Sequence, residues 1–277
     1  MVRTAFTWEC PSPVRPGLRV EAGRGGRISI VQDDKTIVDA VVSSDGSAVQ
    51  FERVASYRSP LPPLRARQAR AAHPDPDGNR WAHRFVAGLS GNPLGPLHSG
   101  TWLATDHRPH DDMGQYCVDP DDDEINWFQW PWHGGRVLTL DELRVIPLLP
   151  LRRLSPPVHD RVKAYRRLSQ EGMPPPVLAW WVSGLFALVV LDGHDRLMAA
   201  LAEDRPPRIV TLGLAVGGDV VDGEVAQAVR NYDAIVERAK RYPLGAAVDA
   251  ADRGLTAKVA AAGLRFGRTR AFGRSRK

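Results

Sequence analysis

Five consecutive residues, Asp192-Gly193-His194-Asp195-Arg196, combine the residue types that bind phosphate groups and move protons. We name this stretch the DGHDR segment. Glycine permits a tight turn that lets the backbone approach a ligand. The residues that follow have a helical pattern, so the turn leads into a helix N-terminus, whose unpaired N–H groups and dipole attract anions. Arg196 falls in the first helical turn, where its planar guanidinium group could clamp phosphate oxygens. The segment therefore predicts a phosphate site.

Three side chains of the DGHDR segment are also candidates for catalysis or metal binding. His194 could transfer a proton or donate a hydrogen bond. Asp192 and Asp195 could hold Mg²⁺ through carboxylate oxygens, or orient His194. The candidate catalytic residues are therefore His194 and Asp195, the candidate metal ligands are Asp192 and Asp195, and the candidate ligand-binding residues are Asp192, Gly193, His194 and Arg196. The structural alternative is that Asp192 caps the helix while Arg196 forms a surface ion pair.

Apolar patterns on both sides of the DGHDR segment predict the elements that position it. Residues 177–191, VLAWWVSGLFALVVL, are two apolar runs joined by Ser183-Gly184, which favours a buried hairpin with a two-residue turn. Strands are also expected over 144–151 and 208–216. A helix is predicted over 158–171, ending at Gly172. Its expected apolar face consists of Val158, Val162, Tyr165 and Leu168.

The order of these elements, with the DGHDR segment and the small Ala199 and Ala200 in the helix after it, resembles the ParB/sulfiredoxin-like superfamily. The resemblance covers about residues 137–214, less than a third of the chain. It implies an α/β fold in which the segment lies at a helix N-terminus and contacts nucleotide phosphates. The implied cofactors are a nucleotide (ATP, ADP or CTP) and Mg²⁺.

Within that superfamily the segment is most similar to the free serine kinases, which have Asp-Gly-His-His-Arg at this position. Asp195 replaces their second histidine, and no glutamate stands at the start of the preceding helix, where only His159 and Asp160 are near. Sulfiredoxins have a cysteine where this chain has His194, so repair of sulfinic acids by that thiol is excluded. Partition proteins have an additional arginine that is absent here. Nucleotide or phosphate binding is what the resemblance implies for this chain.

The chain divides into four predicted parts, and the predicted fold class is α/β or α+β. Residues 17–55 form an expected antiparallel meander, 59–80 a linker, and 81–123 an irregular region. In that region His107 and His110 lie among carboxylates that could bind a metal, although such charge runs are usually solvated loops. The predicted parts are a β-rich N-terminal module (1–126), the ParB/sulfiredoxin-like domain (127–215), a helical extension (216–264, with helices over 222–241 and 246–262) and a basic tail (265–277).

Charge and hydropathy narrow the classes of partner. The net charge of +5 derives from residues 265–277, which carry six basic side chains and no acid, so the rest of the chain is nearly neutral. That tail could contact nucleic acid or a protein partner, whereas strong DNA binding by the body is not expected. The longest apolar run is interrupted and shorter than the about 20 residues of a membrane span. Two cysteines are too few for a disulfide framework. We expect a cytoplasmic protein without membrane contact.

Three functions are compatible with these features. The first is a nucleotide-dependent phosphotransferase or phosphohydrolase that acts on a small-molecule acceptor. The second is a non-catalytic, nucleotide-responsive module that binds nucleic acid or a protein partner. The third is an inactive scaffold that keeps only the fold.

Overall fold

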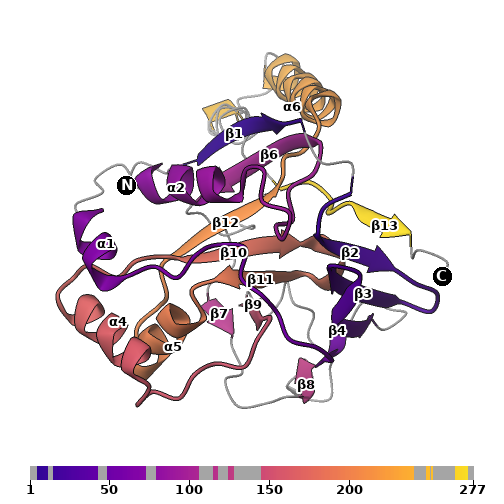
Figure 1. Ribbon diagram of the computed structural model, residues 1–277. Helices are drawn as coiled ribbons and strands as arrows, with labels where there is room; N and C mark the ends of the chain where they lie inside the picture. Colours follow the sequence, from indigo (N-terminus) through magenta and orange to yellow (C-terminus); the bar gives the residue numbers. More distant parts are fainter. Residues whose placement is uncertain are drawn as a thin grey trace, which may run out of the picture.

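The computed structural model describes residues 5–11, 15–42, 49–72, 79–105, 115–117, 124–127, 145–239, 248–249, 251 and 266–273. Within them the chain forms two β-sheets and several helices, which confirms the mixed α/β class (Figure 1). None of the helices in these ranges combines the length and the apolar character that a membrane span requires.

The larger sheet has seven strands and carries the DGHDR segment at the end of a central strand. Its order is β1-β6-β12-β10-β11-β9-β7. Strand β10 pairs antiparallel with β11 and parallel with β12, and β11 pairs parallel with β9. The strands are β1 Ala5–Cys10, β6 Gly100–Thr105, β7 Gln115–Cys117, β9 Val145–Pro150, β10 Val177–Val182, β11 Ala187–Asp192 and β12 Ile209–Leu214.

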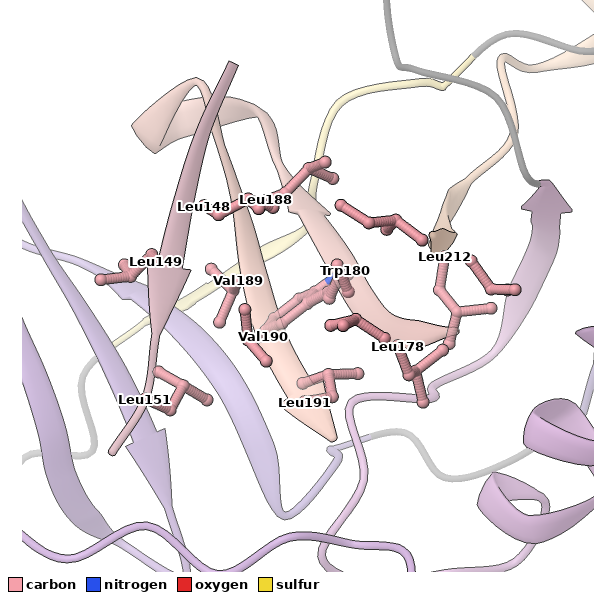
Figure 2. Packing of buried hydrophobic residues seen from close by; sticks show 14 of the residues in the cluster. Leu148, Leu149, Leu151, Leu178, Trp180, Leu188, Val189, Val190, Leu191 and Leu212 are labelled. Carbon is pink, nitrogen blue, oxygen red and sulfur yellow. The ribbon is translucent and has the colours of Figure 1, made fainter. Parts of the chain in front are cut away.

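Strands β10 and β11 are buried along nearly their whole length. Every residue of β10 is buried, as are the first five of β11. Continuous apolar runs are typical of strands covered on both faces. Figure 2 shows their side chains gathered with Leu148 of β9 and Leu212 of β12. Since burying one such side chain stabilises the fold by about 1.5–3 kcal/mol, this core firmly anchors the end of β11.

Two helices, α4 (Asp160–Gln170) and α5 (His194–Ala202), pack against each other beside the larger sheet (Figure 1). Helix α4 buries Val162, Tyr165 and Leu168, as predicted, and the chain turns at Gly172 with φ of 75°. The prediction for Val158 is wrong: its side chain is 68% exposed. The helix starts only at Asp160, with His159 as its N-cap, so Val158 precedes the helical face.

The hairpin of β10 and β11 is confirmed, but its turn is longer than the predicted two residues. Ser183–Leu185 form a short 3₁₀ helix, η1, and Phe186 follows in the left-handed region with φ of 47°. This conformation is uncommon for a bulky residue. The Phe186 ring packs edge-on against Trp181 at 5.3 Å between centroids, and this contact helps to hold the turn.

The smaller sheet confirms the predicted meander and has the order β13-β2-β3-β4-β5-β8. The four strands from β2 to β5 follow one another in the sequence, and each pairs antiparallel with the next. The strands are β2 Leu18–Ala22, β3 Arg27–Gln32, β4 Lys35–Val42, β5 Val49–Arg53, β8 Glu124–Trp127 and β13 Ala271–Gly273.

The sequence prediction fails for part of 59–123. Helix α1 (Ala66–Ala71) matches the expected short helical turn in the linker. Helix α2 (Asn79–Leu89) and strand β6, however, lie where no regular structure was expected. Strand β6 pairs with both β1 and β12, so the larger sheet extends across the predicted boundary at residue 126. His107 and His110 lie outside the described residues.

The C-terminal part of the chain is partly described. Helix α6 (Gly218–Ala239) confirms the first helix of the predicted extension, whereas most of 246–262 lies outside the described residues. Residues 266–273, part of the predicted basic tail, are docked on the protein, and we name them the C-terminal strap. Gly267 N–H donates to the Leu214 carbonyl at 2.7 Å, and β13 pairs with β2. The strap therefore joins both sheets.

Thr269 makes the most extensive polar contacts of the strap. Its hydroxyl accepts from the Ser183 N–H at 2.9 Å and donates to the Trp181 carbonyl at 3.0 Å. Replacing Thr269 by Val leaves both backbone groups without this partner and should lower the free energy of unfolding by about 1–3 kcal/mol. Thr269→Ser keeps the hydroxyl and should lower the free energy of unfolding by less than Thr269→Val does. Urea denaturation measures both, and equal stability of Thr269→Val and the wild type would contradict the role of the strap.

Candidate functional site

The DGHDR segment forms the turn from β11 into α5. Asp192 ends β11, Gly193 is the N-cap of α5 with φ of 97°, and His194 is the first helical residue. A Cβ on Gly193 would strain this backbone and, at 2.6 Å from the guanidinium nitrogens of Arg196, would displace that side chain. No side chain of the described residues caps this helix, so the alternative in which Asp192 is the cap is wrong. The N–H groups of the first turn are left for a ligand.

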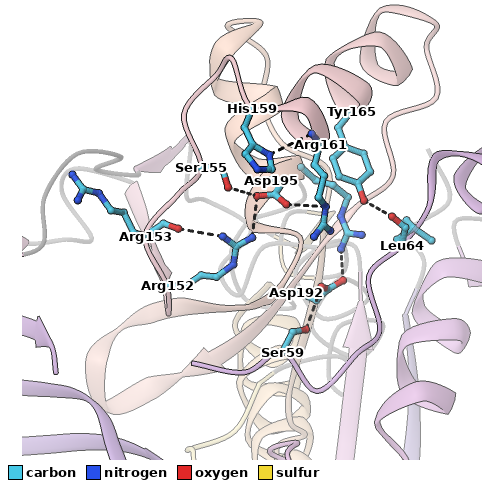
Figure 3. Close-up of polar contacts among 11 residues, drawn as sticks. Ser59, Leu64, Arg152, Arg153, Ser155, His159, Arg161, Tyr165, Asp192 and Asp195 are labelled. Carbon is cyan, nitrogen blue, oxygen red and sulfur yellow. Dashed lines mark hydrogen bonds and ion pairs between the residues drawn. The ribbon is translucent and has the colours of Figure 1, made fainter. Parts of the chain in front are cut away.

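The Asp195 carboxylate is the centre of the site, and its side chain is only 3% exposed. One oxygen accepts from the Ser155 hydroxyl at 2.8 Å and from Arg152 Nη2 at 2.9 Å. The other lies 3.2 Å from Arg161 Nε (Figure 3). Arg152 and Ser155 belong to the segment between β9 and α4, and Arg161 to the first turn of α4. One buried carboxylate thus gathers two arginines from outside its own helix.

A second ion pair joins Asp192 to Arg196, with 2.6 Å between Oδ2 and Nη2. The predicted alternative of a surface pair is wrong, because the two side chains are only 14% and 3% exposed. Ser59 also donates to Asp192, at 3.2 Å. The Arg196 guanidinium lies over the rings of Phe85 and Tyr165, about 6 Å from each centroid. These contacts hold the cation in one orientation.

A cavity of about 100 Å³ lies among these groups. A water molecule occupies about 30 Å³ of liquid, so the cavity has room for one small ion but not for a whole nucleotide. Three arginines and two aspartates line it, which leaves an excess of positive charge. Its lining consists of Ser59, Leu61, Pro63, Leu64, Arg152, Arg161, Tyr165, Asp192, Gly193, His194, Asp195 and Arg196.

Two buried nitrogen atoms, His194 Nε2 and Arg196 Nε, have no hydrogen-bond partner in the part of the chain that the structure describes. Buried polar atoms are normally paired, and leaving one unpaired costs about 1–3 kcal/mol. Within the described residues, the Arg161 guanidinium has a single contact, through Nε to Asp195, so its terminal amino groups remain for another acceptor. A ligand with several acceptor oxygens could accept hydrogen bonds from these amino groups of Arg161.

Burial and charge determine the protonation states of the site. Burial, together with the positive charge of Arg152, lowers the pKa of His194 well below its usual value, so the imidazole is neutral at pH 7. Burial alone would raise the pKa of Asp195, but hydrogen bonds from Ser155 and Arg152 and the charge of Arg161 together lower that pKa. Asp195 is therefore an anion whose described contacts orient arginines.

The predicted metal role of Asp192 and Asp195 stays untested. Each carboxylate already accepts from an arginine, and three guanidinium groups nearby repel a cation. The described residues contain no group of three or more His, Cys, Asp and Glu side chains that could hold a metal ion. This donor set does not fit a resident Mg²⁺. Mg²⁺ is often bound mainly by the phosphates of a ligand, so nucleotide titrations with and without Mg²⁺ would test the role.

The structure brings all five predicted residues together and adds four that sequence reasoning missed: Ser59, Arg152, Ser155 and Arg161. For two of the four residues, the order of the strands could have indicated their position. Because β9 and β11 are parallel neighbours, the residues after both strands lie at the same edge of the sheet. Arg152 and Ser155, shortly after β9, could have been placed near Asp192 from this pairing, but the sequence analysis did not include them. Ser59 comes from a distant loop and had no such signal.

Comparisons of the chain with protein-family models, with curated proteins and with solved structures found no match. The resemblance to the ParB/sulfiredoxin-like superfamily therefore stays a prediction. The function has to be inferred from the site itself.

Neutral His194 should make stability depend on pH. The pKa of His194 in the folded state lies below the unfolded value of about 6.5. The stability that neutral His194 contributes is therefore present above about pH 6.5 and is lost as the pH falls. One such group changes the free energy of unfolding by at most about 1.4 kcal/mol per pH unit. We expect the free energy of unfolding of His194→Gln to fall less steeply from pH 6.5 to 5 than that of the wild type.

Urea denaturation across this pH range measures the difference. His98 is the matched control, because burial lowers its pKa too and it lies outside the cavity lining. His98→Gln keeps His194, so the pH dependence of stability that His194 causes should remain in this variant. Identical slopes for His194→Gln and the wild type would show that His194 is not held neutral.

Proposed function

We propose that this protein binds a phosphate-bearing ligand, and specifically a nucleotide. One phosphate group would lie in the cavity of about 100 Å³, which we name the phosphate cavity. One observation carries the proposal. Three arginines from separate parts of the chain converge on a cavity of phosphate size, and His194 also lines that cavity. The resemblance of the DGHDR segment to nucleotide-binding proteins supports a nucleotide over other phosphates.

Each group has a distinct part in binding. Arg152 and Arg161, at 38% and 48% side-chain exposure, reach toward solvent and can meet an entering phosphate. Charge-assisted hydrogen bonds from arginines contribute about 1.5–3 kcal/mol each. The first N–H groups of α5 add uncharged donors and the positive end of the helix dipole. Asp195 and Asp192 position the arginines rather than touching the ligand.

Neutral His194 suits this function in two ways. It adds no further positive charge to a site with three arginines, and its tautomers offer either an N–H donor or an acceptor at Nε2. In a phosphotransferase or phosphohydrolase, arginines would stabilise the charge on the transferred phosphoryl group. His194 would be the candidate proton acceptor, and Asp195 would position the arginines.

The protonation states favour a second candidate, a nucleotide-responsive module without catalysis. Asp195 is engaged by three donors, and the lowered pKa of His194 makes it a weak base. The exposed Arg268 and Arg270 of the C-terminal strap offer a surface for nucleic acid or a protein partner. A phosphotransfer screen with the bound nucleotide separates the two candidates.

Calorimetric titration with ATP, ADP, CTP and GTP, with and without Mg²⁺, tests the binding. Arg161→Ala should weaken the affinity of the bound nucleotide at least tenfold, since one charge-assisted bond of about 1.5 kcal/mol or more is lost. Arg167→Ala is the matched control, because Arg167 is exposed on the same helix and lies outside the cavity lining. Circular dichroism checks the fold of each variant.

Two outcomes would contradict the proposal. The first is that no nucleotide binds to the folded wild-type protein. The second is that Arg161→Ala and Arg167→Ala bind the nucleotide equally well.

A further inference from the structure

A second cavity, of about 280 Å³, adjoins the phosphate cavity. Tyr165 and Arg196 line both cavities, so these two side chains form a shared wall. The second cavity lies between the C-terminal half of α4, the middle of α5 and the loops that lead into β10 and β12. Its lining consists of Tyr165, Ser169, Gly172, Pro174, Pro175, Val177, Arg196, Ala199, Ala200, Arg205, Pro206, Pro207 and Arg208.

The walls of this second cavity are mostly apolar and rigid. Four prolines, from 174–175 and 206–207, and two alanines of α5 contribute to the lining. Proline has a fixed φ and no N–H, so these parts of the wall are preformed and donate no backbone hydrogen bond. The charged part of the lining consists of Arg196, Arg205 and Arg208. Arg205 is tied to the wall, since its Nη1 donates to the Ser169 carbonyl at 2.9 Å. None of the described residues that line the cavity is acidic.

The sizes of the two cavities limit how a ligand can bind. The phosphate cavity alone holds a single small ion, so the rest of a nucleotide must lie outside it. Pockets for whole organic ligands measure about 300–1,000 Å³, and the two adjoining cavities together fall in that range. Arg196 belongs to both linings, so its guanidinium group could contact a ligand that extends from one cavity to the other.

We infer that the second cavity receives the uncharged ring part of the ligand, so that the ligand is a phosphate ester of a flat, weakly polar ring system such as a nucleoside phosphate. This inference rests on the proposed function. Preformed proline walls lower the ordering cost of binding such a ring.

The inference is tested by comparing pyrophosphate with ADP, ATP, CTP and GTP on the full chain, and by narrowing the second cavity. Ala200 is half-buried in the lining, and Ala202 is half-buried on the same helix outside it. Ala200→Leu should weaken nucleotide binding at least tenfold and change pyrophosphate binding less than twofold. Ala202→Leu should change neither the nucleotide affinity nor the pyrophosphate affinity. Melting temperatures check folding, and Ala200→Val, a smaller intrusion, replaces Ala200→Leu if the latter does not fold.

The outcomes separate this inference from the proposed function. If pyrophosphate binds as tightly as the best nucleotide, or if narrowing the cavity leaves nucleotide affinity unchanged, the second cavity does not hold the ring and the inference is overturned, while phosphate binding stands. If neither pyrophosphate nor any nucleotide binds the wild type, the proposed function itself fails. If the wild type prefers a nucleotide to pyrophosphate and Ala200→Leu abolishes this preference, the result supports both the proposed function and the inference.

Discussion

The burial of one carboxylate, that of Asp195, is the constraint on which the geometry of the site depends. An ionised carboxylate is strongly disfavoured in an apolar interior unless it is paired and hydrogen-bonded. Asp195 meets this requirement through Ser155, Arg152 and Arg161, which belong to two other parts of the chain. Packing of α5 against α4 therefore forces these donors into place. The arginines are positioned by the stability of the fold before any ligand arrives.

The scaffold explains why the pairing occurs at this point of the molecule. Strands β9 and β11 are parallel neighbours, so both end at the same edge of the sheet, which is where ligands bind in many open α/β sheets. The buried β10 and β11 anchor that edge in the largest apolar cluster of the described residues. Gly193 then turns the chain into α5 within one residue. A rigid strand end followed at once by a helix N-terminus leaves little freedom for the charged side chains.

Local patterns in the sequence were sufficient for the elements around the site. The apolar runs of β10 and β11, the glycine at 193 and the face of α4 all have short-range signals. The pairing of β6 with β12 joins segments far apart in the chain, and no local pattern encodes such contacts. The partners of Asp195 were missed for the same reason. An arginine such as Arg161 has the same local signature whether it is solvated or bound to a carboxylate in another helix.

Pairing each carboxylate with an arginine also sets the character of the site. A cluster of arginines without counter-charges would repel itself and destabilise the folded state. Asp192 and Asp195 remove most of that repulsion, yet the three arginines keep an excess of positive charge and a guanidinium carries more N–H donors than one carboxylate can accept. Under the proposed function, a phosphate would therefore bind to the remaining donors while the ion pairs stay in place. Such binding would displace water from the arginines rather than break a buried ion pair.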